Sequence, residues 1–229
     1  MPLVAVTPDS KDFLRDLSLH LNLPPAEPAK LLETGPSGLA YWNCYDYARQ
    51  HGGRIVFGWQ VLAWPGIYFE LLHHAVVEDA DGNLLDPTTC VAAHNGQIVF
   101  IEDREATLSR KSPPPIASRI HVYPGEASAI GEALKDAKAR HFEIKRLLAR
   151  IIEEGGPMPT PVLADYPWPR SPEIVAMLEE LNRSSTAIDD VHARCMAWDL
   201  KKAPKNTPAL YVPTIAHARS ADRRLALHH

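Results

Sequence analysis

The spacing of hydrophobic residues changes about halfway along the chain. From residue 54 to residue 123, β-branched and aromatic residues form runs or alternate with polar residues, a pattern typical of strands. Turn-forming residues separate these runs, most clearly around Gly66, Gly82 and Gly96. The expected strands cover 54–64, 67–78, a return strand from 84, 97–101 and 118–123. Their short connections predict an antiparallel meander.

Helical spacing appears on both sides of these strands. Residues 40–51 predict a helix that ends at Gly52 and carries Cys44 in its first turns. Residues 126–154 carry an apolar stripe with alternating steps of 4 and 3, which predicts one long helix and a seam for a partner or a second copy of the chain. The stripe consists of Ile130, Leu134, Ala137, His141, Ile144, Leu148 and Ile151.

The remaining segments complete the expected domain organisation. Residues 1–34 are expected to form a helical segment, with a helix at 8–23 and a short piece at 29–35. Six prolines within 157–172 predict a stiff, extended linker. The region 173–229 is expected to be helical, with one helix after Ser171-Pro172 and another from Thr186. The sequence therefore predicts an α+β core at 35–125, a long helix at 126–156 and a helical C-terminal region.

Composition excludes several classes of protein. The 229 residues are 45% hydrophobic and 23% charged with a net charge of -4, so neither disorder nor a basic nucleic-acid-binding surface is expected. No apolar run approaches the roughly 20 residues of a membrane span, so no membrane partner is expected. The first residues do not resemble a secretory signal, and three cysteines favour free thiols in the cytoplasm. No cofactor is expected.

One cysteine, one histidine and one aspartate stand out as candidate catalytic residues. Cys44 lies near a helix start, where the helix dipole is expected to lower the thiol pKa and favour the nucleophilic thiolate. His74 follows 30 residues later in an expected strand, and Asp86 follows 12 residues after that, across the turn at Gly82. A hairpin of this length places His74 and Asp86 on neighbouring strands, where the carboxylate can orient the imidazole.

The segment HAVVEDADGNLLDPT at 74–88, preceded by Cys44, resembles the core of the transglutaminase-like superfamily, which has a papain-like fold. The resemblance covers about residues 35–125. It implies a nucleophile helix packed on an antiparallel sheet, with Cys44 as nucleophile, His74 as general acid/base and Asp86 as its orienting partner. Position 38 is a glycine where papain-like proteases place a glutamine, and the spacing from Cys44 to His74 is short for a full transglutaminase, as in a compact or divergent member.

Several assignments stay open at the level of sequence. The candidates for oxyanion or substrate contacts are Trp42, Asn43, Trp59 and Gln60. His73 competes with His74, because successive strand residues face opposite sides and only one of them can face Cys44. We favour His74, which precedes the Ala-Val of the motif. Asp86 has a simpler interpretation as a turn former before Pro87.

Other cysteines and histidines have simpler interpretations. Cys90 and His94 lack the spacing of a metal site with His73 or His74, so no metal is expected. Cys195 is expected in a helical core, and His141 is expected to be a packed or interface residue.

Two functions from different classes follow. The first is a cysteine-dependent acyl-transfer enzyme, a hydrolase or acyltransferase that acts on a peptide, amide or ester. The second is a non-enzymatic interaction module that retains the triad without using it and binds a partner, or a second copy, along the 126–154 helix. Thiol reactivity near neutral pH distinguishes them.

Overall fold

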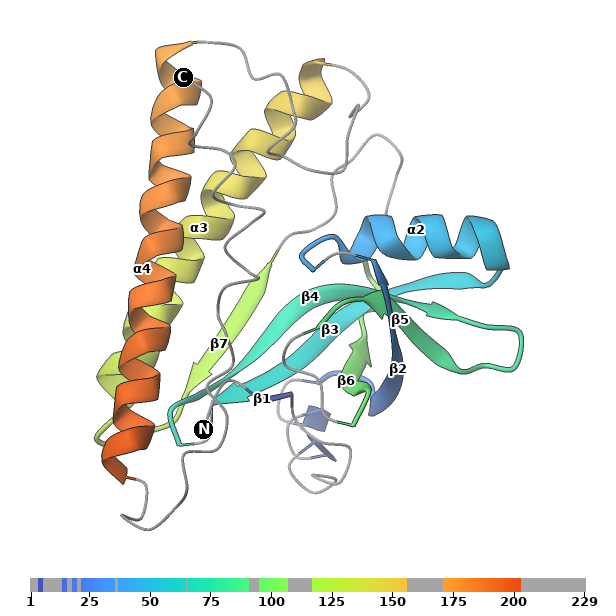
Figure 1. The fold of residues 1–229 in the computed structure, drawn as a ribbon, viewed down its shortest axis with the longest axis horizontal. Helices are drawn as coiled ribbons and strands as arrows, with labels where there is room; N and C mark the ends of the chain where they lie inside the picture. The colour runs from blue at the N-terminus through green and yellow to red at the C-terminus, as the bar shows by residue number, and fades with distance from the viewer. Residues whose placement is uncertain are drawn as a thin grey trace. The chain divides into compact units, whose positions relative to one another are not determined.

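The structure is a computed structural model with both helices and strands, an α+β protein (Figure 1). It describes residues 4–5, 14–15, 18–19, 22–35, 37–64, 66–90, 95–106, 117–155 and 171–202. The chain divides into two compact units. The sheet unit comprises residues 3–63 and 69–109, and the helix unit comprises residues 1–2, 64–68 and 110–229.

The sheet unit contains six strands and the helix α2. They are β1 (Val4–Ala5), β2 (Ala26–Gly35), α2 (Ala40–His51), β3 (Arg54–Trp64), β4 (Tyr68–Glu78), β5 (Leu84–Thr88) and β6 (Gln97–Glu102). The strands follow the order β1-β3-β6-β2-β5-β4, and β3 also pairs with β4, so the sheet closes on itself. In this closed sheet Leu31 of β2 lies opposite Asp86 of β5, and Gln60 of β3 lies opposite Phe100 of β6.

Alternation along the strands gives the closed sheet an inner and an outer face. The inner face holds one cluster of buried residues from four strands: Ala29, Leu31, Val56, Val76, Ile98 and Phe100. The outer face carries Ile55, Phe57, Ala75 and Val77, which pack against Tyr41, Cys44, Tyr47 and Ala48 of α2. Helix α2 therefore covers the outer face of β3 and β4, and Figure 1 shows it lying across the strands.

Closure of the sheet depends on a close approach at Gly58. A Cβ atom at this position would lie 2.1 Å from the carbonyl oxygen of Ile101 and 2.5 Å from the ring of Phe100. Only a glycine leaves room for β6 to pass this close to β3.

The helix unit is dominated by two long helices that lie side by side (Figure 1). These helices are α3 (Ser128–Gly155) and α4 (Pro172–Lys202), and strand β7 (Ser118–Val122) precedes them. Ile144 and Leu148 of the α3 stripe pack against Leu181 of α4. His141 is buried and bonds through Nδ1 to Ser184 Oγ at 3.1 Å, which confirms it as a packed residue.

Several expected elements are confirmed. The helix at 40–51, the strands of the first half and the long helix after residue 126 all appear within a few residues of their expected bounds. Helix α2 ends where Gly52 adopts a φ of 80°, a conformation that favours glycine. Among the described residues, no helix combines the length and apolar character that crossing a bilayer requires.

The expected helical piece at 29–35 and the simple meander are wrong. Residues 26–35 form β2, because Ala29 and Leu31 alternate into the inner face and the backbone pairs with β5 and β6. The meander fails because β6 lies between β3 and β2, and because β2 runs parallel to β5. Both differences arise from long-range strand pairing, which local spacing does not reveal.

The expected helix start at Thr186 is also wrong, because α4 continues through it. The hydroxyls of Ser184 and Thr186 donate hydrogen bonds to the backbone carbonyls of Leu181 and Asn182, respectively. These side chains therefore bond within α4 and do not cap a new helix. Of the expected 8–23 helix, the described residues 14–15 and 18–19 are helical. Positions 157–170 of the expected linker, and His94, lie outside the described residues.

Candidate functional site

His74 and Asp86 form a buried pair inside the closed sheet. His74 Nε2 lies 2.8 Å from Asp86 Oδ2, and Asp86 has no exposed surface. The second carboxylate oxygen accepts the backbone N–H of Thr88 at 2.9 Å. A carboxylate only accepts hydrogen bonds, so Nε2 carries the proton and Nδ1 is the basic nitrogen of the neutral imidazole. This pair holds the elements of a general base and its orienting carboxylate.

The structure places Cys44 in a different environment from this pair. Cys44 has no exposed surface and belongs to the outer-face cluster with Tyr41, Ala75 and Val77. Since successive strand residues face opposite sides, Cys44 lies on the face of β4 that carries His73. The structure thus brings His74 and Asp86 together and places Cys44 across the sheet from them.

Burial also sets the ionisation of Cys44. Burial raises the pKa of the Cys44 thiol far above its ordinary value, and the negative charge of Asp86 raises it further. The expectation that the helix start lowers this pKa is wrong. Cys44 is the fifth residue of α2, beyond the first turn in which the helix dipole acts, and apolar neighbours remove it from water.

His73 has its own partners on the outer face. The hydroxyl of Tyr41 and Nδ1 of His73 are hydrogen-bonded, and Nε2 of His73 lies 3.6 Å from Asp103 Oδ2. The ring of Trp59 meets His73 edge-on at a centroid distance of 4.8 Å. Burial raises the pKa of Tyr41 well above its ordinary value, so its hydroxyl stays protonated and donates to His73.

Cys90 lies on the same face as the His74–Asp86 pair. It is half-buried and packs against the inner-face cluster that contains Val76, two residues after His74. Gln60 donates its Nε2–H to Cys90 Sγ at an N···S distance of 3.1 Å, and Gln60 itself is buried. One of the candidate oxyanion or substrate residues, Gln60, is thus hydrogen-bonded to a cysteine sulfur.

The other three candidates lie elsewhere. Asn43 donates to Thr88 Oγ1 at 3.1 Å and packs against Gly35, so it joins α2 to the ends of β2 and β5. Trp59 is buried beside His73, and Trp42 is half-buried on α2. In the described ranges, no group of three His, Cys, Asp or Glu side chains is arranged to hold a metal ion.

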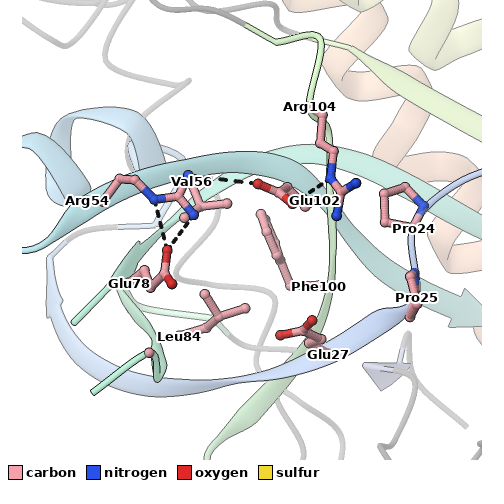
Figure 2. Close-up of a pocket in the computed structure, with 11 residues that line it drawn as sticks. Pro24, Pro25, Glu27, Arg54, Val56, Glu78, Leu84, Phe100, Glu102 and Arg104 are labelled. Carbon is pink, nitrogen blue, oxygen red and sulfur yellow. Dashed lines mark hydrogen bonds and ion pairs between the residues drawn. The ribbon is translucent and has the colours of Figure 1, made fainter. Parts of the chain in front are cut away.

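A pocket of about 140 Å³ opens at one end of the closed sheet (Figure 2). Its apolar lining includes Val56, Leu84 and Phe100, all of which belong to or pack against the inner-face cluster. Charged side chains surround these apolar residues: Glu27, Arg54, Glu78, Glu102 and Arg104. Four of these charges are linked in a chain, in which Arg54 binds Glu78 and approaches Glu102 at 3.8 Å, and Arg104 bonds Glu102 at 3.1 Å.

No family model matches this chain, and comparison with curated proteins and with solved structures likewise finds no match.

Sequence reasoning did not identify Cys90, Tyr41 or Asp103 as members of a polar site. Cys90 is one of three candidate thiols in the sequence, and nothing local distinguishes it, because its contact with Gln60 joins residues 30 positions apart. The even spacing of Val56 and Gln60 along β3, and of His74 and Val76 along β4, was the available signal. This spacing is informative only once the structure shows that both strands direct their even-numbered residues inward.

Proposed function

We propose that this chain is a cysteine-dependent acyl-transfer enzyme of the transglutaminase-like type, a hydrolase or acyltransferase acting on a peptide, amide or ester. His74 serves as general acid/base and Asp86 orients it. The contact that carries the proposal is the 2.8 Å bond between His74 and Asp86, the two residues that the resemblance pairs as general acid/base and orienting partner.

The environment of this pair suits general acid/base catalysis. Asp86 is fully buried and bonded through both oxygens, so it fixes the ring of His74 and the site of its proton. The buried carboxylate also stabilises the imidazolium that forms when His74 accepts a proton from a thiol. No cofactor enters this chemistry, and we place the enzyme in the cytoplasm.

The resemblance proposes Cys44 as the nucleophile. The negative charge of Asp86 acts on the Cys44 thiol and raises its pKa, although the two residues lie on different sides of the sheet. In the structure Cys44 is a neutral, enclosed thiol, so attack by Cys44 requires α2 to move away from β4.

The alternative, an interaction module that binds along the long helix, has less support. Ile144 and Leu148 of the α3 stripe already pack against α4 of the same chain. The seam proposed for a partner or for a second copy is therefore covered at these positions.

The test is a search for acyl-enzyme formation and turnover with p-nitrophenyl esters and peptide anilides. We expect turnover, together with an acylated protein that is detected by intact mass, and we expect both to be lost in His74→Ala. Asp103→Asn, which alters the carboxylate beside His73, is the matched control and should retain turnover. The proposal fails if no acyl-enzyme forms, or if His74→Ala acylates as fast as the wild type.

A further inference from the structure

We propose that Cys90 is the thiol that works with the His74–Asp86 pair, and that Gln60 is the amide donor beside it. The inference rests on the proposed acyl-transfer function and changes its nucleophile from Cys44 to Cys90. Three observations carry it: the face on which each thiol lies, the exposure of the thiol and its hydrogen-bond donor.

The two faces of β4 separate the candidate thiols. Val76 shares its face with His74 and belongs to the cluster against which Cys90 packs. Cys44 packs against Ala75 and Val77 on the opposite face. Cys90 and His74 therefore share one face of the sheet, whereas Cys44 and His74 do not.

The end of β5 holds Cys90 in position. Thr89 donates both its N–H and its hydroxyl to the carbonyl of Gly35, each at 2.8 Å, which fixes the chain immediately before Cys90. Asp86 lies four residues before Cys90 on the same strand end and is itself fixed by Thr88. The nucleophile and the orienting carboxylate are thus held by one short, anchored segment.

Exposure and hydrogen bonding also favour Cys90. It is half-buried, whereas Cys44 and Cys195 have no exposed surface. An N–H donated to sulfur stabilises the thiolate, and Gln60 supplies one at 3.1 Å. When the sulfur attacks a carbonyl, the same amide lies beside the reacting atoms and can donate to the oxygen that becomes negative.

The proposed reaction has two balanced steps. His74 Nδ1 accepts the thiol proton, Cys90 Sγ forms a bond to the carbonyl carbon, and the C–N or C–O bond of the substrate breaks as His74 returns that proton to the leaving amine or alcohol. A water, or an acceptor amine, then attacks the thioester and gives a proton to His74. The C–S bond breaks, and the thiol regains its proton.

The test maps the adduct on the full-length chain after acylation by p-nitrophenyl acetate, and separately after alkylation by iodoacetamide near neutral pH. Peptide mass mapping is expected to find both adducts on Cys90. Cys90→Ser should lower the acylation rate on the order of 10³-fold or more, by analogy with removal of a serine nucleophile. Cys195→Ser, which makes the same change in the helix unit, is the matched control and should stay close to wild type. Because serine also accepts the Gln60 hydrogen bond, Cys90→Ser should fold, which a thermal melt checks.

The pH dependence of Cys90 alkylation provides a second test. It should not change with Asp86 or Gln60 if Cys90 has only a structural role. Asp86→Asn weakens the imidazolium, so alkylation of Cys90 should need a higher pH to reach half its maximal rate. Gln60→Leu should shift the profile in the same direction. Profiles that coincide with that of the wild type would overturn the role of Cys90.

The two proposals fail in different ways. An adduct on Cys44 that disappears in His74→Ala would overturn the assignment of Cys90 and leave the acyl-transfer function standing. Acylation that is independent of His74, or absent from every cysteine, would overturn the proposed function itself.

Discussion

His73 and His74 are neighbours in β4 and are equally buried, yet they differ in hydrogen-bond partner and in the burial of the nearby carboxylate. His73 faces α2, where it bonds a neutral tyrosine hydroxyl and stands 3.6 Å from Asp103. His74 faces the interior of the closed sheet and bonds a fully buried carboxylate at 2.8 Å. A shift of one residue exchanges these two environments. For these two histidines, which share residue type and adjacent positions in the chain, the face of the sheet decides which partners each one has.

The largest expected effect is a loss of acylation rate in Asp86→Asn, compared with the same carboxylate-to-amide change at Asp103 on the other face. Asp86→Asn removes the acceptor that fixes the His74 tautomer, so we expect acylation to slow by roughly 10²–10⁴-fold, by analogy with serine triads. Asp103→Asn makes the same change beside His73 and should leave the rate near that of the wild type. Acylation rates of the two variants, measured with p-nitrophenyl acetate, compare the faces directly. A larger loss of acylation rate in Asp103→Asn than in Asp86→Asn would show that the active site lies on the outer face.

The next effect tests the closure that creates an inner face. In Gly58→Ala the new Cβ would meet the carbonyl of Ile101 at 2.1 Å and the ring of Phe100 at 2.5 Å. We expect a loss of about 1–3 kcal/mol in the free energy of unfolding, because the added methyl group overpacks the sheet. Urea denaturation measures it.

Gly82→Ala is the matched control for this measurement. No atom lies within 4 Å of a Cβ at position 82, although its φ of 82° adds backbone strain. Equal or smaller destabilisation by Gly58→Ala would contradict the close approach of β3 and β6.

A smaller effect is expected on the outer face. Tyr41→Phe removes the hydroxyl that bonds His73 Nδ1 in a buried setting, which should cost about 1–2 kcal/mol of stability. Tyr45→Phe, on the exposed side of the same helix, should cost less. If Cys90 is the nucleophile, Tyr41→Phe should leave the acylation rate unchanged, because the change lies across the sheet. Thermal melts and acylation rates of both variants measure these effects.

Local sequence patterns predicted much of the fold. The strand periods, the turns at glycine and the helix ending at Gly52 are set by residues within one element, and the structure confirms them. The position of β6 between β3 and β2 depends on pairings between residues far apart in the chain, such as Gln60 with Phe100, and no local signal specifies it.

The candidate site divides in the same way. The His74–Asp86 contact follows from a hairpin of fixed length, so chain spacing was sufficient to predict it. The side of the sheet on which α2 packs is a tertiary choice, and it separates Cys44 from His74. For the same reason the contact between Gln60 and Cys90 was not foreseen.

The smallest effect, the pH dependence of stability, tests the environment of Cys44. Burial raises the pKa of Cys44 in the folded protein, so above the unfolded thiol pKa of about 8.5 the unfolded state loses a proton that the folded state keeps. Ionisation then favours unfolding, and the contribution of Cys44 to stability should fall by about 0.8 kcal/mol between pH 7 and pH 9. The stability difference between wild type and Cys44→Ala, measured by urea denaturation, should therefore shrink as pH rises.

The thiol pKa of Cys195 is also raised, to about 12, so Cys195→Ala should show the same sign. A reactive thiolate paired with an imidazolium has a lowered pKa in the folded state, and the difference would instead grow with pH. A growing difference for Cys44→Ala beside a shrinking one for Cys195→Ala would return the nucleophile to Cys44.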